Sequence, residues 1–329
     1  MAAALLAGCA SAVPAATPGG RSPTGGATTS SGASGSPAAS GSEAGPAPGA
    51  TPSATSASTP GGDGRPELPG GGRRLLPDYR LVGFAGVPGS RAMGRLGIGD
   101  LDTRAREIVE VGKPYADGRT VMPVLELIAT IVQGQPGRDG KYRSRVSSHV
   151  VDDYLAAARG VHGILLINIQ PGRADFLDEV KSYEKWLTEP DVGIALDQEW
   201  SMGPGQVPMK VFGHTTGRTI DSVAAYLAAI VKEHDLPEKA LVFHQLSPAI
   251  VSQQSNIRQH QGVVVIKSVD GIGSRGAKES TWRKLTTDLP SSVHAGFKLF
   301  YEEDRNHGPL MTPAQVLALR PQPDYVLYE

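Results

Sequence analysis

The sequence predicts an α/β fold, a single (β/α)8 barrel that follows a disordered N-terminal tether. Eight short apolar runs alternate with segments of helical spacing between residues 75 and 329. Such alternation indicates parallel strands joined by right-handed crossovers. This stretch also has about the 250 residues that are typical of one closed barrel, so closure is favoured over an open, doubly wound sheet.

The first 74 residues differ in composition from the rest of the chain. From Ala10 to Arg74 almost every residue is Ala, Gly, Ser, Thr or Pro. A segment with so few large apolar residues cannot bury enough surface to offset the entropy lost on ordering. The predicted organisation is a short signal segment over residues 1–9, a disordered linker over 10–74 and a TIM-type barrel domain over 75–329.

The eight apolar runs are rich in Val, Ile, Leu, Phe or Tyr, and several of them are nearly continuous. Continuous apolar runs are typical of strands that are buried on both faces. The predicted strands are Tyr79–Gly86, Thr120–Thr130, Gly163–Gln170, Val192–Glu199, Ala240–Gln245, Val263–Asp270, Ala295–Tyr301 and Asp324–Tyr328.

The segments between these runs carry apolar residues at the spacing of an amphipathic helix. Thr312 followed by Pro313 also predicts a helix start, because Thr is a good N-cap and Pro suits the first helical position. The predicted helices are Asp100–Val111, Val150–Ala158, Ala174–Thr188, Thr219–His234, Lys278–Leu289 and Thr312–Leu319.

Composition and short motifs exclude several partners. Lys and Arg number 32 against 33 Asp and Glu, a formal net charge of -1, so neither nucleic acid nor an anionic membrane surface is predicted as a partner. The sequence has no apolar run long enough to span a membrane. Gly83, Gly86 and Gly89 do not give the G-x-G-x-x-G spacing of a dinucleotide-binding loop, and we predict no cofactor.

The fourth predicted strand sets the direction of its side chains, which alternate between two faces. Bulky Ile194 and Leu196 suit the face that packs on helices, which leaves Asp197 and Glu199 on the inner face at the C-terminal end. In the sixth strand, Val264 and Ile266 are taken to face outward. The same pattern places further polar residues inside the barrel: Glu126, Asn168, Gln170, His244, Lys267, Lys298 and Glu302.

This convergence of charge predicts a site rather than a scaffold. A barrel built for stability alone would fill its inner layers with Val, Ile and Leu, and buried charges are costly unless they are paired. We expect a polar site at the strand ends where barrel enzymes keep their chemistry. The structural alternative is a network in which Lys267 and Lys298 neutralise Glu126 and Asp197.

Two carboxyl groups spaced two residues apart in a strand lie about 6–7 Å apart. One of them can then hold its proton while the other is ionised. This arrangement suits Glu199 as a general acid on a glycosidic oxygen, with Asp197 beside it. Trp200 and Tyr301 complete the predicted substrate-binding set, which also contains Glu126, Asn168, Gln170, His244, Lys267 and Lys298.

The segment from Gly193 to Glu199 resembles the fourth-strand motif of chitinase-like glycoside hydrolases, Asp-Gly-x-Asp-x-Asp-x-Glu. The resemblance implies that Glu199 is the acid and that Asp197 orients the substrate. Val192 and Ala195 stand where that motif has its first two acids. Glu199 and Glu302 are also placed similarly to the acid/base and nucleophile of many retaining barrel glycosidases, a scheme that needs carboxyl groups about 5–5.5 Å apart.

Leu6-Ala7-Gly8-Cys9 resembles the lipobox of bacterial lipoproteins, and Cys9 is the single cysteine of the chain. The resemblance implies that Cys9 carries a lipid and that the barrel lies on the extracytoplasmic face of the cell membrane. The whole chain resembles actinobacterial-type lipoproteins in its Ala-, Gly- and Pro-rich composition. No Lys or Arg precedes Cys9, so we expect the true start codon to lie upstream.

The sequence therefore predicts a lipid-anchored glycoside hydrolase that acts on an extracytoplasmic glycan. Its catalytic residues would be Glu199, Asp197 and Glu302. A non-catalytic barrel that binds carbohydrate or another small ligand is the alternative. No metal is predicted, although a divalent cation held by the strand-end carboxylates would suit a third class, a metal-dependent hydrolase or lyase.

Overall fold

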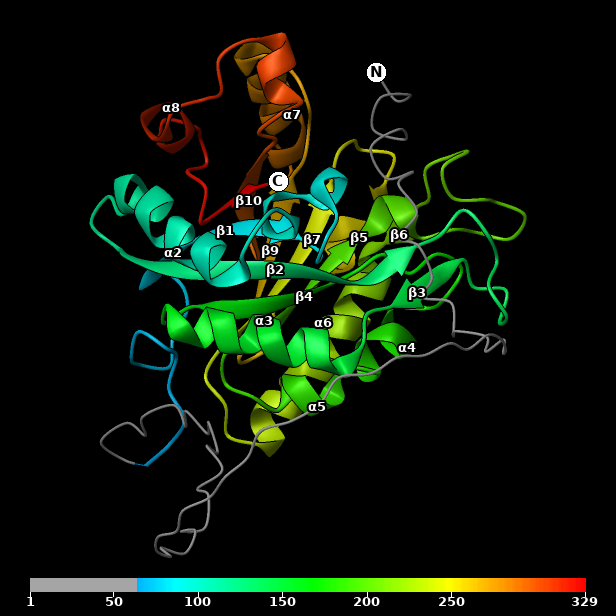
Figure 1. The fold of residues 1–329 in the computed structure, drawn as a ribbon, viewed down its shortest axis with the longest axis horizontal. Coiled ribbons are helices and arrows are strands. Elements are labelled where there is room, and N and C mark those ends of the chain that lie inside the picture. The colour runs from blue at the N-terminus through cyan, green and yellow to red at the C-terminus, as the bar shows by residue number, and fades with distance from the viewer. Residues whose placement is uncertain (1–63) are drawn as a thin grey trace, which may run out of the picture. The chain divides into compact units, whose positions relative to one another are not determined.

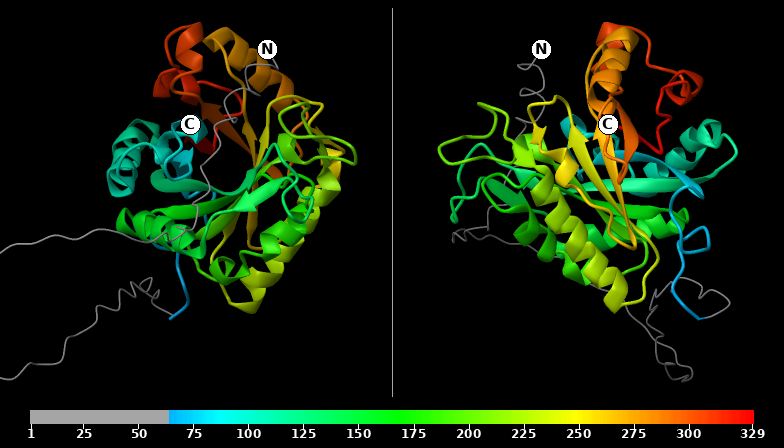
Figure 2. Two further views of the ribbon diagram at one scale, coloured as in Figure 1. Left: turned by 45° about the vertical axis from the view of Figure 1, so that its right-hand side comes forward. Right: turned by 180° about the vertical axis from the view of Figure 1, so that it is seen from behind.

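Eight parallel strands close into a barrel in the computed structural model, which describes residues 64–329 (Figures 1 and 2). The strand order around the barrel is β1-β2-β4-β5-β7-β9-β10-β11, and β1 closes it by pairing with both β2 and β11. The predicted barrel is confirmed. The barrel strands are β1 Tyr79–Gly86, β2 Thr120–Val132, β4 Ile164–Ile169, β5 Val192–Asp197, β7 Lys239–Gln245, β9 Val263–Val269, β10 Val293–Leu299 and β11 Tyr325–Tyr328.

Helices cover the outside of this barrel (Figure 2). The α-helices are α2 Leu101–Gly112, α3 Ser148–Gly160, α4 Phe176–Lys181, α5 Glu184–Leu187, α6 Gly217–Glu233, α7 Arg275–Thr286 and α8 Pro313–Leu317. Short 3-10 helices occur at η1 Arg91–Met93, η2 Arg95–Gly97, η3 Lys113–Tyr115, η4 Gln198–Trp200, η5 Gln254–Asn256 and η6 Asp304–His307.

The predicted helix over residues 174–188 forms as two shorter helices, α4 and α5, with a break at Ser182 and Tyr183. The Ser182 hydroxyl donates to the carbonyl of Glu179, and Tyr183 turns its ring into the core, where its hydroxyl bonds to Thr130. The other predicted helices match observed ones. At α8 the predicted N-cap is confirmed, because Thr312 and Gln315 form a reciprocal capping box.

Three short strands lie outside the barrel. β3, Arg143–Arg145, pairs antiparallel with the end of β2, which extends beyond the barrel to meet it. β6, Thr215–Thr216, pairs with β8, Val251–Ser252, in a separate small sheet. Arg143 and Arg145 both bond to the buried carboxylate of Glu179 on α4, so this pairing fastens β3 to the body of the domain.

Two apolar layers hold the barrel together. The outer layer lies between strands and helices and includes Leu125, Ile167, Ile194, Phe243 and Phe297. The inner layer has fewer members and fills the barrel interior away from the C-terminal strand ends. Its members are Leu68, Leu75, Leu76, Tyr79, Leu81, Ala85, Met122, Val124, Ile164, Leu166, Ala195, Ala240, Val242, Val264, Ile266, Tyr325 and Leu327. The inner face therefore becomes polar only toward the C-terminal strand ends.

Residues 64–74, which the sequence assigns to the linker, pack onto the end of the barrel opposite the C-terminal strand ends. Leu68 is 4% exposed and belongs to the inner apolar layer. The Arg73 guanidinium donates to the carbonyl of Leu236 and pairs with Asp235. The predicted signal segment, Cys9 and most of the predicted linker lie outside the described residues.

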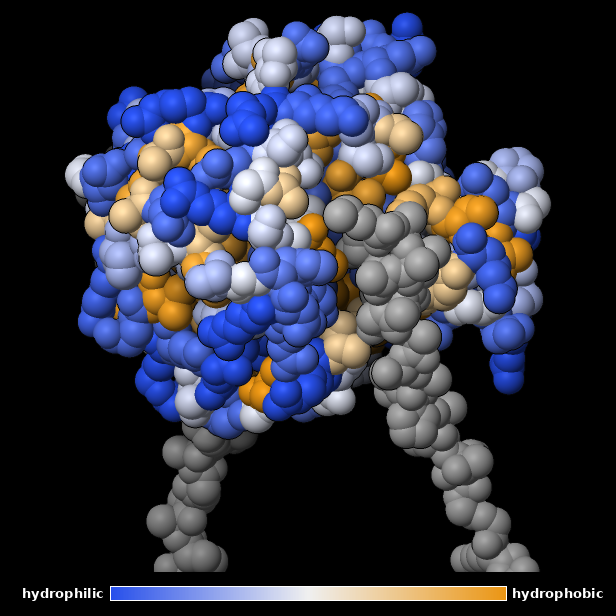
Figure 3. Space-filling model, turned by 90° about the horizontal axis from the view of Figure 1, so that it is seen from above, coloured by the Kyte–Doolittle hydropathy of each residue, from blue (hydrophilic) through white to orange (hydrophobic). Residues whose placement is uncertain are grey.

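Polar groups dominate the surface of the described domain. Val211 is the exposed large hydrophobic residue of residues 64–329. Figure 3 shows one face on which hydrophilic residues predominate and hydrophobic ones form separate small areas. None of the helices within residues 64–329 has the length and hydropathy needed to cross a membrane.

Candidate functional site

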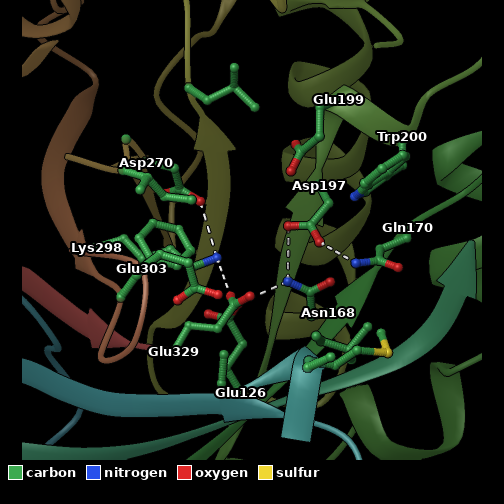
Figure 4. A pocket seen from close by; sticks show the side chains of 18 of the residues that line it. Glu126, Asn168, Gln170, Asp197, Glu199, Trp200, Asp270, Lys298, Glu303 and Glu329 are labelled. Atoms are coloured by element: carbon green, nitrogen blue, oxygen red, sulfur yellow. Dashed lines mark hydrogen bonds and ion pairs between the residues drawn. The ribbon is translucent and has the colours of Figure 1, made fainter. Parts of the chain in front are cut away.

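A pocket lined by six carboxyl groups opens at the C-terminal ends of the barrel strands (Figure 4). Its polar lining is Glu126, Asn168, Gln170, Asp197, Glu199, Asp270, Lys298, Glu303 and Glu329. Its remaining walls are mainly apolar: Ala85, Ala92, Met93, Ile128, Trp200, Phe212, Leu246, Gly271, Ile272 and Phe300. The predicted location of the site at this end of the barrel agrees with this pocket.

His244, at the floor of the site, joins the carboxylate of Glu126 on β2 to that of Asp270, which directly follows β9. Its Nε2 lies 2.9 Å from Glu126 Oε1, and its Nδ1 lies 3.0 Å from Asp270 Oδ2. Burial alone would lower the pKa of His244, but the charges of Asp270 and Glu126 reverse this effect and raise it well above its ordinary value. We infer a charged imidazolium at neutral pH, in which both ring nitrogens donate.

Glu126 is fully buried, and both of its carboxylate oxygens accept hydrogen bonds. Its Oε1 also accepts from Asn168 Nδ2 at 2.8 Å, and its Oε2 accepts from the Tyr325 hydroxyl at 2.9 Å. Burial favours the neutral acid, but the charges of His244 and Lys298 and the hydrogen bond from Asn168 hold the pKa of Glu126 below its ordinary value. Glu126 is therefore an ionised, structurally fixed carboxylate.

Asp197 ends β5 and points into the pocket. Gln170 Nε2 donates to its Oδ2 at 3.0 Å, and Asn168 Nδ2 approaches its Oδ1 at 3.2 Å. Both donors come from the neighbouring β4 and the residue that follows it. The two amides fix the orientation of the Asp197 carboxylate, as Figure 4 shows.

Lys298 supplies the second cation of the site. Its Nζ lies 2.6 Å from Glu329 Oε2 and 3.1 Å from Asp270 Oδ2. Burial would lower the pKa of Lys298, but these two carboxylates raise it well above its ordinary value. Despite its own burial, Asp270 keeps a pKa below its ordinary value because His244 and Lys298 both stabilise its charge.

Glu199 differs from the other carboxyl groups because it lacks a cationic partner. It follows β5 in the 3-10 helix η4, so it reaches the pocket through a turn rather than from the strand itself. Its Oε2 is buried and has no hydrogen-bond partner within the described chain. Burial, followed by the charges of Asp197 and Asp270, raises the pKa of Glu199 well above its ordinary value. The surroundings of Glu199 therefore favour its protonated form over its carboxylate.

Trp200 is 3% exposed and forms part of the pocket wall. Its ring makes an edge-to-face contact with Phe212 at a centroid distance of 6.4 Å. Phe212 lies in the long loop after η4, which the backbone ties back through a hydrogen bond from Gly213 to the Glu199 carbonyl. The same loop therefore positions an aromatic wall beside Glu199.

Three of the predicted site residues lie elsewhere. Lys267 faces outward and donates to the carbonyl of Leu285 on α7, because Val264 and Ile266 occupy the inner face of β9. The Glu302 side chain is 64% exposed and pairs with Arg91, since β10 ends at Leu299 and the following turn directs Glu302 to solvent. Tyr301 packs in the outer layer and stacks on Tyr328. The inward predictions for Lys267 and Glu302 were wrong.

Four residues of the site are not among the predicted site residues. Asp270 and Tyr325 join the buried network, and Glu303 and Glu329 line the pocket. Asp270 shares the parity of Ile266 and Ser268, so the correct phase of β9 would have revealed it. Glu329 shares the parity of Tyr325 and Leu327 on β11, but a Tyr-rich strand gives no clear indication of which face is inner.

The arrangement separates carboxyl groups into two chemical states. The surroundings of Glu199 favour its protonated form, whereas the cationic partners of Glu126 and Asp270 favour their ionised forms. Adjacent acid and carboxylate groups of this kind can donate a proton and stabilise a developing positive charge. Between residues 64 and 329, no cluster of His, Cys, Asp or Glu has the geometry to hold a metal ion.

Comparisons with known proteins assign no family. The sequence matches no family model and no curated protein. Similar solved structures include a GH18 chitinase from Pseudoalteromonas aurantia, with 11% identity, a TM-score of 0.35 and coverage of 76% of this chain and 93% of that one.

Two further structures are comparably distant. The spore cortex-lytic enzyme SleL of Bacillus megaterium has 9% identity and a TM-score of 0.35 over 67% of this chain and 51% of its own. An endocellulase from Pyrococcus horikoshii, solved in complex with cellotetraose, has 10% identity and a TM-score of 0.38 over 76% and 84%. Identities and TM-scores this low do not assign the chain to a family. The fold and the site define its class as a (β/α)8 barrel with an acidic pocket at the strand ends.

Proposed function

We propose that this chain is a glycoside hydrolase in which Glu199 is the general acid. The observation that carries the proposal is the state of its carboxyl group: it lies in the pocket at the strand ends, lacks a cationic partner and has a raised pKa. An acid whose raised pKa favours its protonated form can protonate the oxygen of a glycosidic bond as that bond breaks.

The neighbouring carboxylates suit a second requirement of this reaction, the stabilisation of positive charge on the sugar. Glycosidic cleavage passes through a transition state that resembles an oxocarbenium ion. Asp197 and Asp270 both lie close enough to Glu199 to raise its pKa by their charge. The same negative field would stabilise positive charge on the sugar ring as the bond lengthens.

The test is turnover by the Glu199→Gln variant on a panel of aryl glycosides, oligosaccharides and peptidoglycan. Glutamine keeps the size of the side chain but cannot donate a proton as an acid. We expect a loss of about 100-fold or more in kcat on a substrate that the unchanged protein hydrolyses. Glu302→Gln is the matched control, because Glu302 is exposed outside the pocket lining, and it should retain full activity.

Equal activity of Glu199→Gln and the unchanged protein would contradict the proposal. Binding of a sugar without turnover by either protein would instead support a non-catalytic carbohydrate-binding barrel. Isothermal calorimetry on the same panel separates these two outcomes, because it measures binding whether or not a bond is cleaved.

We also propose that Cys9 anchors the protein by a lipid on the extracytoplasmic face of the cell membrane, where a glycan would be the substrate. The support is the segment Leu6–Cys9 together with the Ala-, Gly-, Ser-, Thr- and Pro-rich sequence that follows it. Cys9→Ser should abolish incorporation of labelled fatty acid when the gene is expressed from its natural locus. Labelling that persists in Cys9→Ser would exclude this site of attachment.

A further inference from the structure

The pocket contains more negative charge than its own cations neutralise. Six carboxyl groups line it, whereas His244 and Lys298 are the cations that contact them within residues 64–329. Negative charge remains in excess even when Glu199 is counted as a neutral acid. A concave site of one sign with apolar walls concentrates its field on whatever enters it.

One buried hydrogen-bond acceptor in the pocket lining lacks a donor. Asn168 is 2% exposed, and its Nδ2 is committed to Glu126 and Asp197. Because carboxylates only accept, the amide nitrogen must face them, which leaves Oδ1 as a buried acceptor. No donor in the described chain reaches this oxygen. A buried acceptor without a donor is costly, so a donor from a bound molecule would satisfy it.

Glu303 provides a carboxylate without a partner in the described chain at the rim of the pocket. Its side chain lines the pocket and is exposed. Unlike Glu329, which pairs with Lys298, Glu303 has no ion pair or side-chain hydrogen bond within residues 64–329. Trp200 and Phe212 add aromatic faces to the same pocket, and such faces attract cations.

We propose that the substrate of this pocket is a glycan of amino sugars that carry free, protonated amino groups. An ammonium group has three donors, no acceptor and a positive charge, which matches the free acceptors, the excess carboxylates and the aromatic wall. A neutral or N-acetylated sugar would satisfy the acceptors but leave the excess charge unbalanced. This inference rests on the proposed hydrolase and names its substrate class.

The test compares oligosaccharides of equal length that differ at one substituent. Glucosamine oligomers, their N-acetylated forms and neutral gluco-oligomers are titrated into the full chain in a calorimeter, and their hydrolysis is followed separately. We expect the glucosamine oligomer to bind roughly tenfold more tightly at low salt. The advantage should shrink in about 1 M salt, where charges are screened within about 3 Å.

Two neighbouring carboxylates give a matched pair of variants. Glu303→Gln removes a charge from the pocket lining and should reduce the preference for the glucosamine oligomer several-fold. Glu302→Gln removes a charge of the same kind one residue away, outside the pocket lining, and should leave the preference unchanged. Equal effects of the two variants would show that overall charge, not this pocket, sets the preference, and would overturn the inference.

The outcome for the substrate class is distinguishable from the outcome for the reaction. Hydrolysis of neutral or N-acetylated oligomers without a preference for free amines would overturn the inference and leave the hydrolase intact. Selective, salt-sensitive binding of the free amines without hydrolysis would support recognition of amino sugars and remove the proposed reaction.

Discussion

Glu199 is a residue whose surroundings oppose its ionisation, and this property can be tested without a substrate. Its pKa is raised in the folded chain by burial and by Asp197 and Asp270, whereas in the unfolded chain it should return to about 4.3. The folded state therefore binds more protons between these two values, and stability must fall as pH rises through that window.

Glu199→Gln removes this penalty, so we expect the variant to be more stable than the unchanged protein at pH 8. The difference should be small near pH 4, where Glu199 is protonated in both states. Each unit of raised pKa corresponds to about 1.4 kcal/mol in the free energy of unfolding, which urea titrations at several pH values can measure. Glu302→Gln should show no such trend. A Glu199→Gln variant that is equally or less stable at pH 8 would contradict the assigned state of Glu199.

The buried network around His244 stabilises the negative charges of the carboxylates that the site brings together. Each of its carboxylates either contacts His244 or Lys298 or accepts from a neutral donor such as Tyr325. Removal of one partner from such a network leaves another charge buried and unpaired, which is more costly than the pair itself is stabilising. His244 is thus a positioning residue for Glu126 and Asp270.

At the scale of elements, strand parity could be predicted wherever polar and apolar residues alternate. In β4, Ile167 and Ile169 flank Asn168, and the predicted inward direction of Asn168 agrees with its contacts. The β9 run Val263–Ile266 is apolar at every position, so both phases bury equally good residues. Which alternate residues of β9 face inward depends on how they pack against the other strands inside the barrel, and this tertiary packing cannot be read from the strand alone.

Loops after the strands were harder to predict than the strands. The turn after β10 sends Glu302 to solvent and Glu303 to the pocket, although the two residues are chemically identical. Asp304 fixes this turn by accepting from the backbone of Gly273 and Phe300 and by pairing with Lys278 on α7 at 2.9 Å. Two of these partners, Gly273 and Lys278, lie far from Asp304 in the sequence, so no local pattern indicates the direction of either glutamate.

At the scale of the whole domain, the two ends of the barrel have different roles. The C-terminal strand ends carry the pocket, whereas residues 64–78 cover the opposite end with Leu68, Leu75 and Leu76. The chain therefore enters the barrel at the end away from the site.

This closing segment predicts how the domain responds to truncation. A chain that begins at residue 64 should keep the free energy of unfolding of the whole protein, because every described contact is retained. A chain that begins at Asp78 loses three buried leucines, each of which contributes about 1.5–3 kcal/mol, so stability should fall by roughly 5 kcal/mol or more. Since domains are commonly stable by only about 5–15 kcal/mol, we expect this chain to unfold at low urea or to be insoluble.

A single substitution, Leu75→Ala, tests the same segment in a chain that still folds. We expect it to lower the free energy of unfolding by about 2–5 kcal/mol, whereas the exposed-site change Val211→Ala is the control. Equal urea midpoints for Leu75→Ala and Val211→Ala would show that the segment does not close the barrel in solution.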